Sequence, residues 1–273
     1  MYLGLCDVFS PAYPKFEWVE RALQQLGHTT LRVRNESDIS EANRCDLLLF
    51  SQNYPFLPCL FSPPKAIWIF DLIGHGIGDA LLEHTPWSDF DAVFCKNPQD
   101  IDHPKAFWLD QAAPDWPPGN YERKWDVIIP GRMRPSRLKA AEAIRDAGIR
   151  VAMAGFAWNP VPTSDGLGRE TSQGRLPYLG NFLTDEAMQR LFGSAKVIVG
   201  DDYIKLRGYW SDRRWLAAAA GTPYIEVGND VTYALKNWYA LHKVALRVAD
   251  NNRYRHRCEQ LLKQVAHRDL VGC

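Results

Sequence analysis

Apolar positions in the first half of the chain fall into short, nearly continuous runs. These runs occupy residues 2–9, 28–33, 46–50, 66–70, 91–95 and 106–109. After the first run, the apolar residues of 16–26 recur at helical spacing until Gly27 ends the pattern. Strands that are apolar on both faces are typical of a parallel sheet covered by helices on both sides. The pattern therefore predicts a doubly wound α/β domain.

The same rhythm restarts after a proline-rich stretch at 111–124, which reads QAAPDWPPGNYERK and predicts a linker. Further strands are expected at 126–129, 150–154, 196–199 and 223–227, and further helices at 136–147, 185–192, 212–220 and 252–267. The expected fold class is thus α/β, with two Rossmann-like doubly wound domains facing a cleft. We expect domains at 1–115 and 125–250, followed by a C-terminal helix within 251–273 that packs back on the first domain. Ligands of such sheets lie at the carboxyl ends of the strands.

Composition and charge narrow the class of protein. The 273 residues contain no run near the roughly 20 apolar residues of a membrane helix and no leader-like N-terminus. A cytoplasmic protein with no membrane partner is therefore expected. The six cysteines form no C-x-x-C pair, so no metal site is expected. Residues 1–120 carry 8 basic and 16 acidic side chains, and the remainder 24 and 16, so the second half is the one suited to phosphate groups.

One candidate phosphate site is PGRMRPSR at 130–137, placed directly between a predicted strand and a predicted helix. Gly131 permits a tight turn, the helix N-terminus offers backbone N–H groups, and Arg132, Arg134 and Arg137 supply positive charge. The alternative is a basic surface loop with solvated arginines. The segment is not the G-x-x-x-x-G-K-[ST] phosphate loop, which argues against an ATPase or GTPase.

A second candidate is KLRGYWSDRRWLAAAAGT at 205–222. Gly208 permits a close turn, and Tyr209 and Trp210 offer flat faces. Ser211 and Asp212 are suited to the start of a helix, and Arg213 lies in its first turn. These residues would present donors to a phosphate, whereas the alternative is a well-capped, alanine-rich core helix.

Proton transfer has a candidate in WIFDLIGHGIGD at 68–79. Asp71 ends a predicted strand and His75 follows between glycines. Either side chain there could accept the proton of an acceptor hydroxyl as a general base. The alternative is a helix cap and a loop histidine. Asp7, at the end of the first strand, is a weaker candidate.

The order of these segments resembles the donor-binding half of GT-B glycosyltransferases. The residues that carry the resemblance are the Gly131-Arg132 turn, the strand ending in Gly155, YLGNFLTDEAMQRLFGSAKVIVG, and GYWSDRRWLAAAAGTPYI. The likeness covers about residues 125–228 and is closest to CgeB-like proteins and phage-encoded, DNA-modifying glycosyltransferases.

The resemblance implies a nucleotide-sugar donor, most simply a UDP-sugar, with no obligatory metal or other cofactor. Its donor-site residues would be Arg132, Arg137, Ser211 and Arg213 at the diphosphate, with Tyr178 and Gly180 near the base. Members of the family often place a Glu where this chain has Leu216. Either the nucleoside contact then comes from elsewhere, with Glu226 as the candidate, or the donor is an unusual one.

The phage relatives also imply an acceptor, a hydroxymethylated pyrimidine in double-stranded DNA, within the host cytoplasm. Such an enzyme must take the base out of the stack, and its phosphate contacts would come from the acceptor-side residues Lys205, Arg207, Arg253 and Arg255, together with His256 and Arg257. The acidic first half would repel DNA, so a glycan acceptor stays open, as does a non-catalytic nucleotide-binding module. A dinucleotide-dependent oxidoreductase is disfavoured because no G-x-G-x-x-G follows Gly4.

Overall fold

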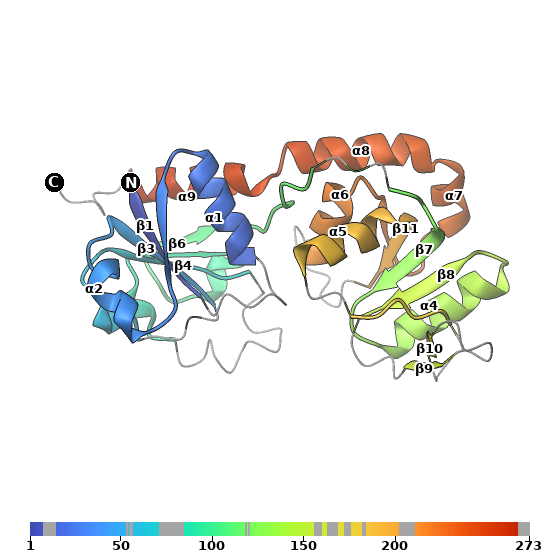
Figure 1. Ribbon diagram of the computed structural model, residues 1–273, viewed down its shortest axis with the longest axis horizontal. Helices are drawn as coiled ribbons and strands as arrows, with labels where there is room; N and C mark the ends of the chain where they lie inside the picture. Colours follow the sequence, from blue (N-terminus) through green and yellow to red (C-terminus); the bar gives the residue numbers. More distant parts are fainter. Residues whose placement is uncertain are drawn as a thin grey trace. The chain divides into compact units, whose positions relative to one another are not determined.

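The computed structural model describes residues 1–7, 15–52, 54, 57–70, 85–117, 119, 121–155, 160–162, 169–171, 176–181, 184–201 and 211–266. The chain divides into two compact units (Figure 1). Unit 1 comprises Met1–Ala112 together with Arg253–Cys273, and unit 2 comprises Ala113–Asn252. Unit 1 is therefore built from two segments that are far apart in the sequence.

Unit 1 contains a six-stranded, all-parallel sheet in the order β2-β1-β3-β4-β5-β6. Its strands are β1 (Tyr2–Cys6), β2 (Thr29–Val33), β3 (Leu47–Ser51), β4 (Lys65–Trp68), β5 (Ala92–Cys95) and β6 (Ala106–Trp108). All residues of β3 and β5 are buried, which is why the sequence shows continuous apolar runs rather than alternation. Asp91 was expected to begin a strand. Its carboxylate instead accepts a hydrogen bond of 2.9 Å from the backbone N–H of Lys65, just before β5.

The helices of unit 1 are α1 (Lys15–Gln25), α2 (Ile39–Ala42) and α9 (Tyr254–Ala266), with single 3₁₀ turns at Glu36–Asp38, Pro58–Leu60, Trp87–Asp89 and Pro98–Asp100. Helix α9 packs against α1 although more than two hundred residues separate them. Tyr254 is 1% exposed, and its ring lies 5.6 Å from that of Trp18 and 5.9 Å from that of Trp68. The C-terminal helix thus completes the core of unit 1.

Unit 2 contains a four-stranded parallel sheet in the order β12-β11-β7-β8 and a two-stranded antiparallel hairpin. The sheet strands are β7 (Trp125–Pro130), β8 (Val151–Ala154), β11 (Ala195–Gly200) and β12 (Tyr224–Glu226), and the hairpin strands are β9 (Pro160–Pro162) and β10 (Arg169–Thr171). The helices are α4 (Pro135–Asp146), α5 (Asp185–Gly193), α6 (Asp212–Ala219), α7 (Val231–Lys236) and α8 (Trp238–Asp250). Apolar side chains of α4 and α7 pack with those of β7, β8 and β11 in one buried cluster.

The predicted fold class, α/β with two doubly wound domains, is confirmed by the two parallel sheets and their helices. Three features of unit 2 were not predicted: the hairpin and the helices α7 and α8. Helix α8 carries Leu241, Ala245 and Val248 at helical spacing, so its signal was present in the sequence.

The return of α9 to unit 1 changes the charge balance. Unit 1 has 13 basic and 17 acidic residues, and unit 2 has 19 and 15. The net charges are therefore −4 and +4, half the asymmetry that a simple cut near residue 120 gives. Much of the acidity of the first segment is offset by the basic helix that joins it.

Replacing Tyr254 with Ala should destabilise unit 1 by about 3–5 kcal/mol, because it opens a cavity between α9 and two tryptophans. Urea denaturation followed by tryptophan fluorescence measures this. Tyr233→Ala is the control, since that side chain is 62% exposed and should change stability by less than about 0.5 kcal/mol. Equal midpoints for the two variants would contradict the packing role of α9.

Candidate anion-binding site of unit 2

Two glycines allow the backbone at the carboxyl end of β7 to lie in close contact with the backbone at the carboxyl end of β8. Gly131 has φ 113° and Gly155 has φ 114°, conformations that favour glycine. The N–H of Gly131 donates to the carbonyl of Ala154 at 2.8 Å. A Cβ added to Gly155 would lie 2.5 Å from the carbonyl oxygen of Gly131. Only glycine fits this close approach, which leaves the strand ends without side chains at the edge where ligands of parallel sheets bind.

Two arginines converge on this glycine turn from the first turns of different helices. Arg137 belongs to α4 and Arg213 to α6, and a Cβ on Gly131 would lie 2.7 Å from Nη1 of Arg137 and 3.1 Å from Nη1 of Arg213. Both guanidinium groups donate through Nη2 to the carbonyl of Asp201 at 3.1 Å, just after β11. Arg137 also donates through Nη1 to the carbonyl of Arg132 at 2.6 Å.

The pairing of these two cations is electrostatically costly without an anion. Arg137 is 1% exposed. Burial, and then the charges of Arg213 and Arg134, lower the pKa of Arg137 from 12.5 to about 10. Like charges that share a site destabilise the charged form of each, whereas an anion placed between them removes the penalty. The geometry is therefore that of an anion site.

Unsatisfied donors support the same interpretation. The Oγ of Ser211 and the Nε of Arg137 are buried, and neither forms a hydrogen bond with any described part of the chain. Ser211 occupies the N-cap position of α6, but its side chain does not cap the helix. Buried polar atoms normally find partners, so two orphans beside a cation pair indicate a ligand with acceptor oxygens.

Asp201 and Ser136 also belong to this site, although the sequence reasoning did not single them out. Ser136 Oγ donates to Asp201 Oδ2 at 2.5 Å, which ties the start of α4 to the end of β11. Asp201 lies two residues after the predicted strand at 196–199, at the edge of a parallel sheet where functional side chains gather. This position after a strand is the feature by which the sequence could have identified Asp201 as a site residue.

Tyr178 and Gly180 lie beside the glycine turn. The segment around Tyr178 pairs with β8 through a bridge to Met153. The Tyr178 hydroxyl lies 2.8 Å from the carbonyl oxygen of Gly155, and the N–H of Gly155 donates to the carbonyl of Gly180 at 2.9 Å. The structure thus brings together four predicted donor-site positions: Gly131, Gly155, Tyr178 and Gly180.

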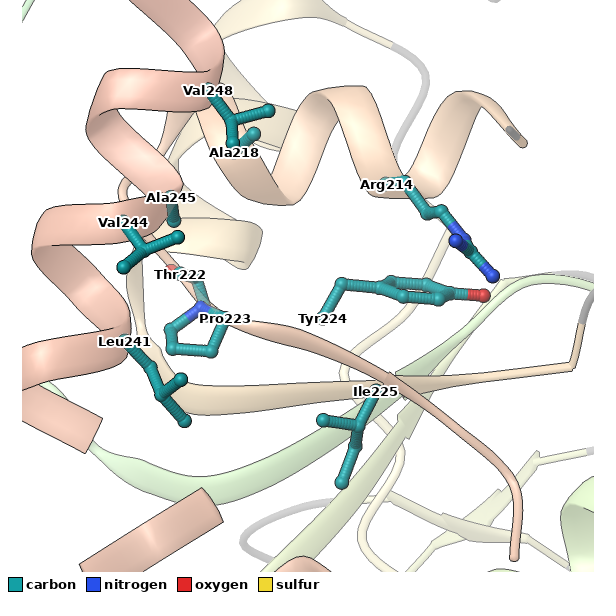
Figure 2. A pocket seen from close by; sticks show the side chains of 10 residues that line it. All are labelled: Arg214, Ala218, Thr222, Pro223, Tyr224, Ile225, Leu241, Val244, Ala245 and Val248. Carbon is teal, nitrogen blue, oxygen red and sulfur yellow. The ribbon is translucent and has the colours of Figure 1, made fainter. Parts of the chain in front are cut away.

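Glu226 ends β12 and is held by an arginine. Its carboxylate forms an ion pair with Arg214 of α6, and its side chain is 38% exposed. The guanidinium of Arg214 also lies 5.2 Å from the ring centroid of Tyr224 (Figure 2). Leu216, the position at which the resemblance led us to expect a Glu, is 8% exposed and belongs to the buried side of α6. Glu226 is therefore the carboxylate available at the carboxyl end of β12.

A neighbouring pocket of about 180 Å³ has a different character (Figure 2). It is lined by Arg214, Ala218, Thr222, Pro223, Tyr224, Ile225, Leu241, Val244, Ala245 and Val248. Apart from Arg214, which is engaged with Glu226, no charged side chain lines it. This lining suits apolar groups and not a diphosphate, so the anion site remains at the glycine turn.

The other predicted site residues are distributed as follows. Arg132 has an exposed side chain, and Asp212 is the half-buried first residue of α6. Both Arg253 and Arg255 lie in unit 1. Arg253 immediately precedes α9, and Arg255 is its second residue. Seven predicted residues lie outside the described part of the chain: Asp71, His75, Lys205, Arg207, Gly208, Tyr209 and Trp210.

Unit 1 has a row of buried polar side chains after its strands. Asp7 follows β1, is 7% exposed and accepts a hydrogen bond of 2.5 Å from the hydroxyl of Ser51. Lys96 and Asp110 follow β5 and β6 and lie 3.5 Å apart. Within the described residues, no three His, Cys, Asp or Glu side chains gather into a metal-binding group. No described helix has the length and apolar character needed to cross a bilayer.

Inorganic pyrophosphate should raise the melting temperature of the protein, because it neutralises the repulsion between Arg137 and Arg213. Arg213→Ala should abolish this response while keeping unliganded stability within about 1 kcal/mol of wild type, since the lost hydrogen bond is offset by relief of like-charge repulsion. Thermal melts with and without pyrophosphate measure both quantities. Arg190→Ala is the control, because its side chain is 67% exposed on α5. An undiminished response in Arg213→Ala would place the anion elsewhere.

Comparison with known proteins finds similarity between this chain and solved structures. No protein-family model matches the sequence, and no curated protein matches it. A solved alpha-glucosyltransferase in complex with UDP and a 13-mer DNA containing a central A:G mismatch is similar with a TM-score of 0.58 and 11% identity, over 96% of this chain and 94% of that chain.

Lower similarity is found to two spinosyn transferases. The forosaminyltransferase SpnP has a TM-score of 0.49 at 12% identity, over 97% of this chain and 99% of that one. The rhamnosyltransferase SpnG has a TM-score of 0.46 at 11% identity, over 98% and 96%. At 11% identity, what this chain shares with the alpha-glucosyltransferase is the fold. The chain has the GT-B fold of two Rossmann-like domains.

Proposed function

We propose that the protein is a glycosyltransferase that moves a sugar from a nucleoside diphosphate sugar to an acceptor hydroxyl. The observation that carries this proposal is the arginine pair at the Gly131 turn, with Arg137 buried and Arg213 half-buried. Both donate to the carbonyl of Asp201, and the buried Ser211 hydroxyl and Arg137 Nε have no hydrogen-bond partner in the described chain. A diphosphate supplies two negative charges and several acceptor oxygens, which suit two adjacent guanidinium groups. The GT-B fold is compatible with such a donor.

The donor is best accommodated by unit 2, with a UDP-sugar as the first candidate. Its diphosphate would bind Arg137 and Arg213, its base would lie near Tyr178 and Gly180, and Glu226 would accept hydrogen bonds from the ribose. The solved alpha-glucosyltransferase with this fold contains UDP, which supports a uridine donor here. We include no metal in the donor site, since the two guanidinium groups can neutralise the diphosphate themselves.

The reaction then needs a base and a stabilised leaving group. The acceptor oxygen forms a bond to the anomeric carbon as the bond from that carbon to the diphosphate breaks. The acceptor proton passes to a carboxylate or imidazole, for which Asp71 and His75 are our candidates and Asp7 the reserve. The electron pair leaves with the nucleoside diphosphate, whose developing charge Arg137 and Arg213 stabilise.

For the acceptor we propose a 5-hydroxymethylpyrimidine in DNA. Arg253 and Arg255 bring positive charge to unit 1, whose net charge is −4 rather than −8. This weakens the electrostatic objection to a polyanion. The solved alpha-glucosyltransferase is also described with DNA. A glycan acceptor is the second candidate, and it fits the acidic character that unit 1 retains. A phage origin, the CgeB-like grouping and a cytoplasmic location belong to this same proposal.

Incubating the purified protein with a panel of nucleotide sugars and duplex DNA containing 5-hydroxymethylcytosine or 5-hydroxymethyluracil tests the function. Nuclease digestion and mass analysis should show a hexose or pentose increment on the modified nucleoside. Unmodified duplex is the control, because it lacks the hydroxyl. A donor that raises the melting temperature without any increment would redirect the acceptor to glycans. No donor response at all would favour a non-catalytic module.

Asp71→Asn should lower turnover by about 10²- to 10⁴-fold, since the amide cannot accept the proton. Donor affinity, measured by calorimetry with UDP, should stay at the wild-type value. His75→Gln and Asp7→Asn, assayed beside it, identify which of the three groups is the base. Full turnover in Asp71→Asn would remove that residue from the mechanism.

Glu226→Gln should raise the KM for the donor by roughly 10- to 100-fold, the equivalent of a hydrogen bond to a charged group. Turnover at saturating donor should change little, because ribose is bound alike in the ground and transition states. Glu186→Gln is the matched control, as that side chain is 74% exposed and forms an ion pair with Arg190 on its own helix. An unchanged KM would exclude Glu226 from the donor site.

A further inference from the structure

Glu226 lies one strand away from the anion site. Strand β12 pairs with β11 in a parallel register that places Glu226 opposite Gly200, and the N–H of Val227 donates to the carbonyl of Gly200 at 2.8 Å. The residue that follows Gly200 is Asp201, whose carbonyl accepts hydrogen bonds from both arginines of the anion site. Adjacent strands are about 4.8 Å apart, so Glu226 and the arginine pair share one edge of the sheet.

Two consecutive arginines in the first turn of α6 have different partners at this edge. Arg213 donates to the carbonyl of Asp201, just after β11, and Arg214 forms an ion pair with the carboxylate of Glu226, at the end of β12. Successive side chains of a helix point about 100° apart, so the two cations extend from one helix end toward neighbouring strands. Helix α6 thus connects the anion site to the Glu226 carboxylate.

A tyrosine also contacts the guanidinium group of Arg214. Tyr224 precedes Glu226 by two residues in β12, so both side chains lie on the same face of the sheet. Its ring centroid is 5.2 Å from the guanidinium carbon (Figure 2). A Cβ added to Gly200 would lie 2.1 Å from the Tyr224 hydroxyl oxygen, so a side chain there would displace the ring. Arg214 is therefore held by an aromatic ring and a carboxylate together.

The ion pair leaves part of the Glu226 carboxylate available to a ligand. The side chain of Arg214 is 21% exposed and that of Glu226 is 38% exposed. Arg214 donates to Oε1, and among the described residues no hydrogen-bond donor lies on Oε2. An ionised carboxylate has about four lone-pair positions, so the pair can still accept hydrogen bonds from hydroxyl groups. Pairing with a cation also offsets the repulsion between this carboxylate and a nearby diphosphate.

We propose that Arg214 is a positioning residue for donor binding, which orients the Glu226 carboxylate toward the ribose hydroxyls of the nucleoside diphosphate. This inference rests on the proposed function and adds a residue that acts through Glu226 without touching the donor. The alternative is an ion pair that only ties α6 to β12. Such a pair would contribute to stability and would not distinguish one nucleoside diphosphate from another.

The test compares, by calorimetry on the full chain, the affinities for UDP and for the UDP analogue that lacks both ribose hydroxyls. Wild type should prefer UDP by roughly 10- to 100-fold, as expected for hydrogen bonds to a charged group. Arg214→Ala should lower this preference by roughly 5- to 50-fold, because a carboxylate that is no longer held loses its directed hydrogen bonds. Both ligands carry the same diphosphate, so any change in repulsion or in stability cancels in the ratio.

Two further variants make the result specific to the pair. Arg214→Gln keeps much of the side chain over Tyr224 and should lower the preference in the same way, which provides a second readout if Arg214→Ala folds poorly. Combining Arg214→Ala with Glu226→Gln should give the same preference as Glu226→Gln alone, because the two residues act as one unit.

Lys196→Ala is the matched control. Lys196 Nζ lies 2.8 Å from Asp126 Oδ1, and the two side chains are 34% and 19% exposed. This ion pair also joins two elements of unit 2, but Asp126 and Lys196 are the second residues of β7 and β11, at the amino ends of the strands. Its loss should leave the preference for UDP at the wild-type value.

The outcomes distinguish this inference from the proposed function. A wild-type preference in Arg214→Ala overturns the inference, as does an equal loss in Lys196→Ala, and neither result affects the donor site itself. A wild-type protein that binds UDP and its analogue equally also overturns it. A wild-type protein that binds neither ligand overturns the UDP-sugar donor together with the inference. A preference lost in both Arg214 variants and kept in Lys196→Ala supports it.

Discussion

Two arginines held side by side, Arg137 buried and Arg213 half-buried, are the constraint on which the rest of unit 2 depends. Their guanidinium groups share the carbonyl of Asp201 and leave little room at Gly131. Such a pair is unfavourable by itself, because Arg137 is desolvated and the two charges repel each other. The strands β7, β8 and β11 with the helices α4 and α6 hold the pair in place, so part of the free energy gained by packing the sheet offsets this repulsion.

The surrounding elements explain how that site stays open. Gly131 and Gly155 both have positive φ and lie backbone to backbone, so neither contributes a Cβ to the space that Arg137 and Arg213 approach. Ser211 leaves its hydroxyl unused at the start of α6. These residues adopt conformations or leave polar groups unbonded in ways that do not favour local stability. Such features gathered at one edge of a sheet are typical of a functional site.

The sequence predicted the sheets well, because parallel strands buried on both faces leave continuous apolar runs that need no long-range information. It also singled out Gly131, Arg137, Ser211 and Arg213, which stand at strand-to-helix turns where charge and glycine occur together. It did not single out Asp201 or Arg214. Their contacts depend on partners supplied by another element, such as Glu226 of β12 for Arg214, and no local pattern encodes such pairings. The placement of α9 on α1 changes the charge of unit 1 for the same reason.

The discontinuity of unit 1 has a consequence for how the chain folds during synthesis. Its first segment ends at Ala112, and its last helix begins only after Asn252, once all of unit 2 has been made. Until then the surface of α1 around Trp18, and Trp68 in the sheet, lack the aromatic ring of Tyr254 that covers them in the finished fold. Unit 2 is a continuous segment and can therefore fold before unit 1 is complete, although N-terminal domains usually fold first. The nascent protein therefore carries an uncovered apolar face while about half of its length is being translated, and this is the interval in which a chaperone would have the most to protect.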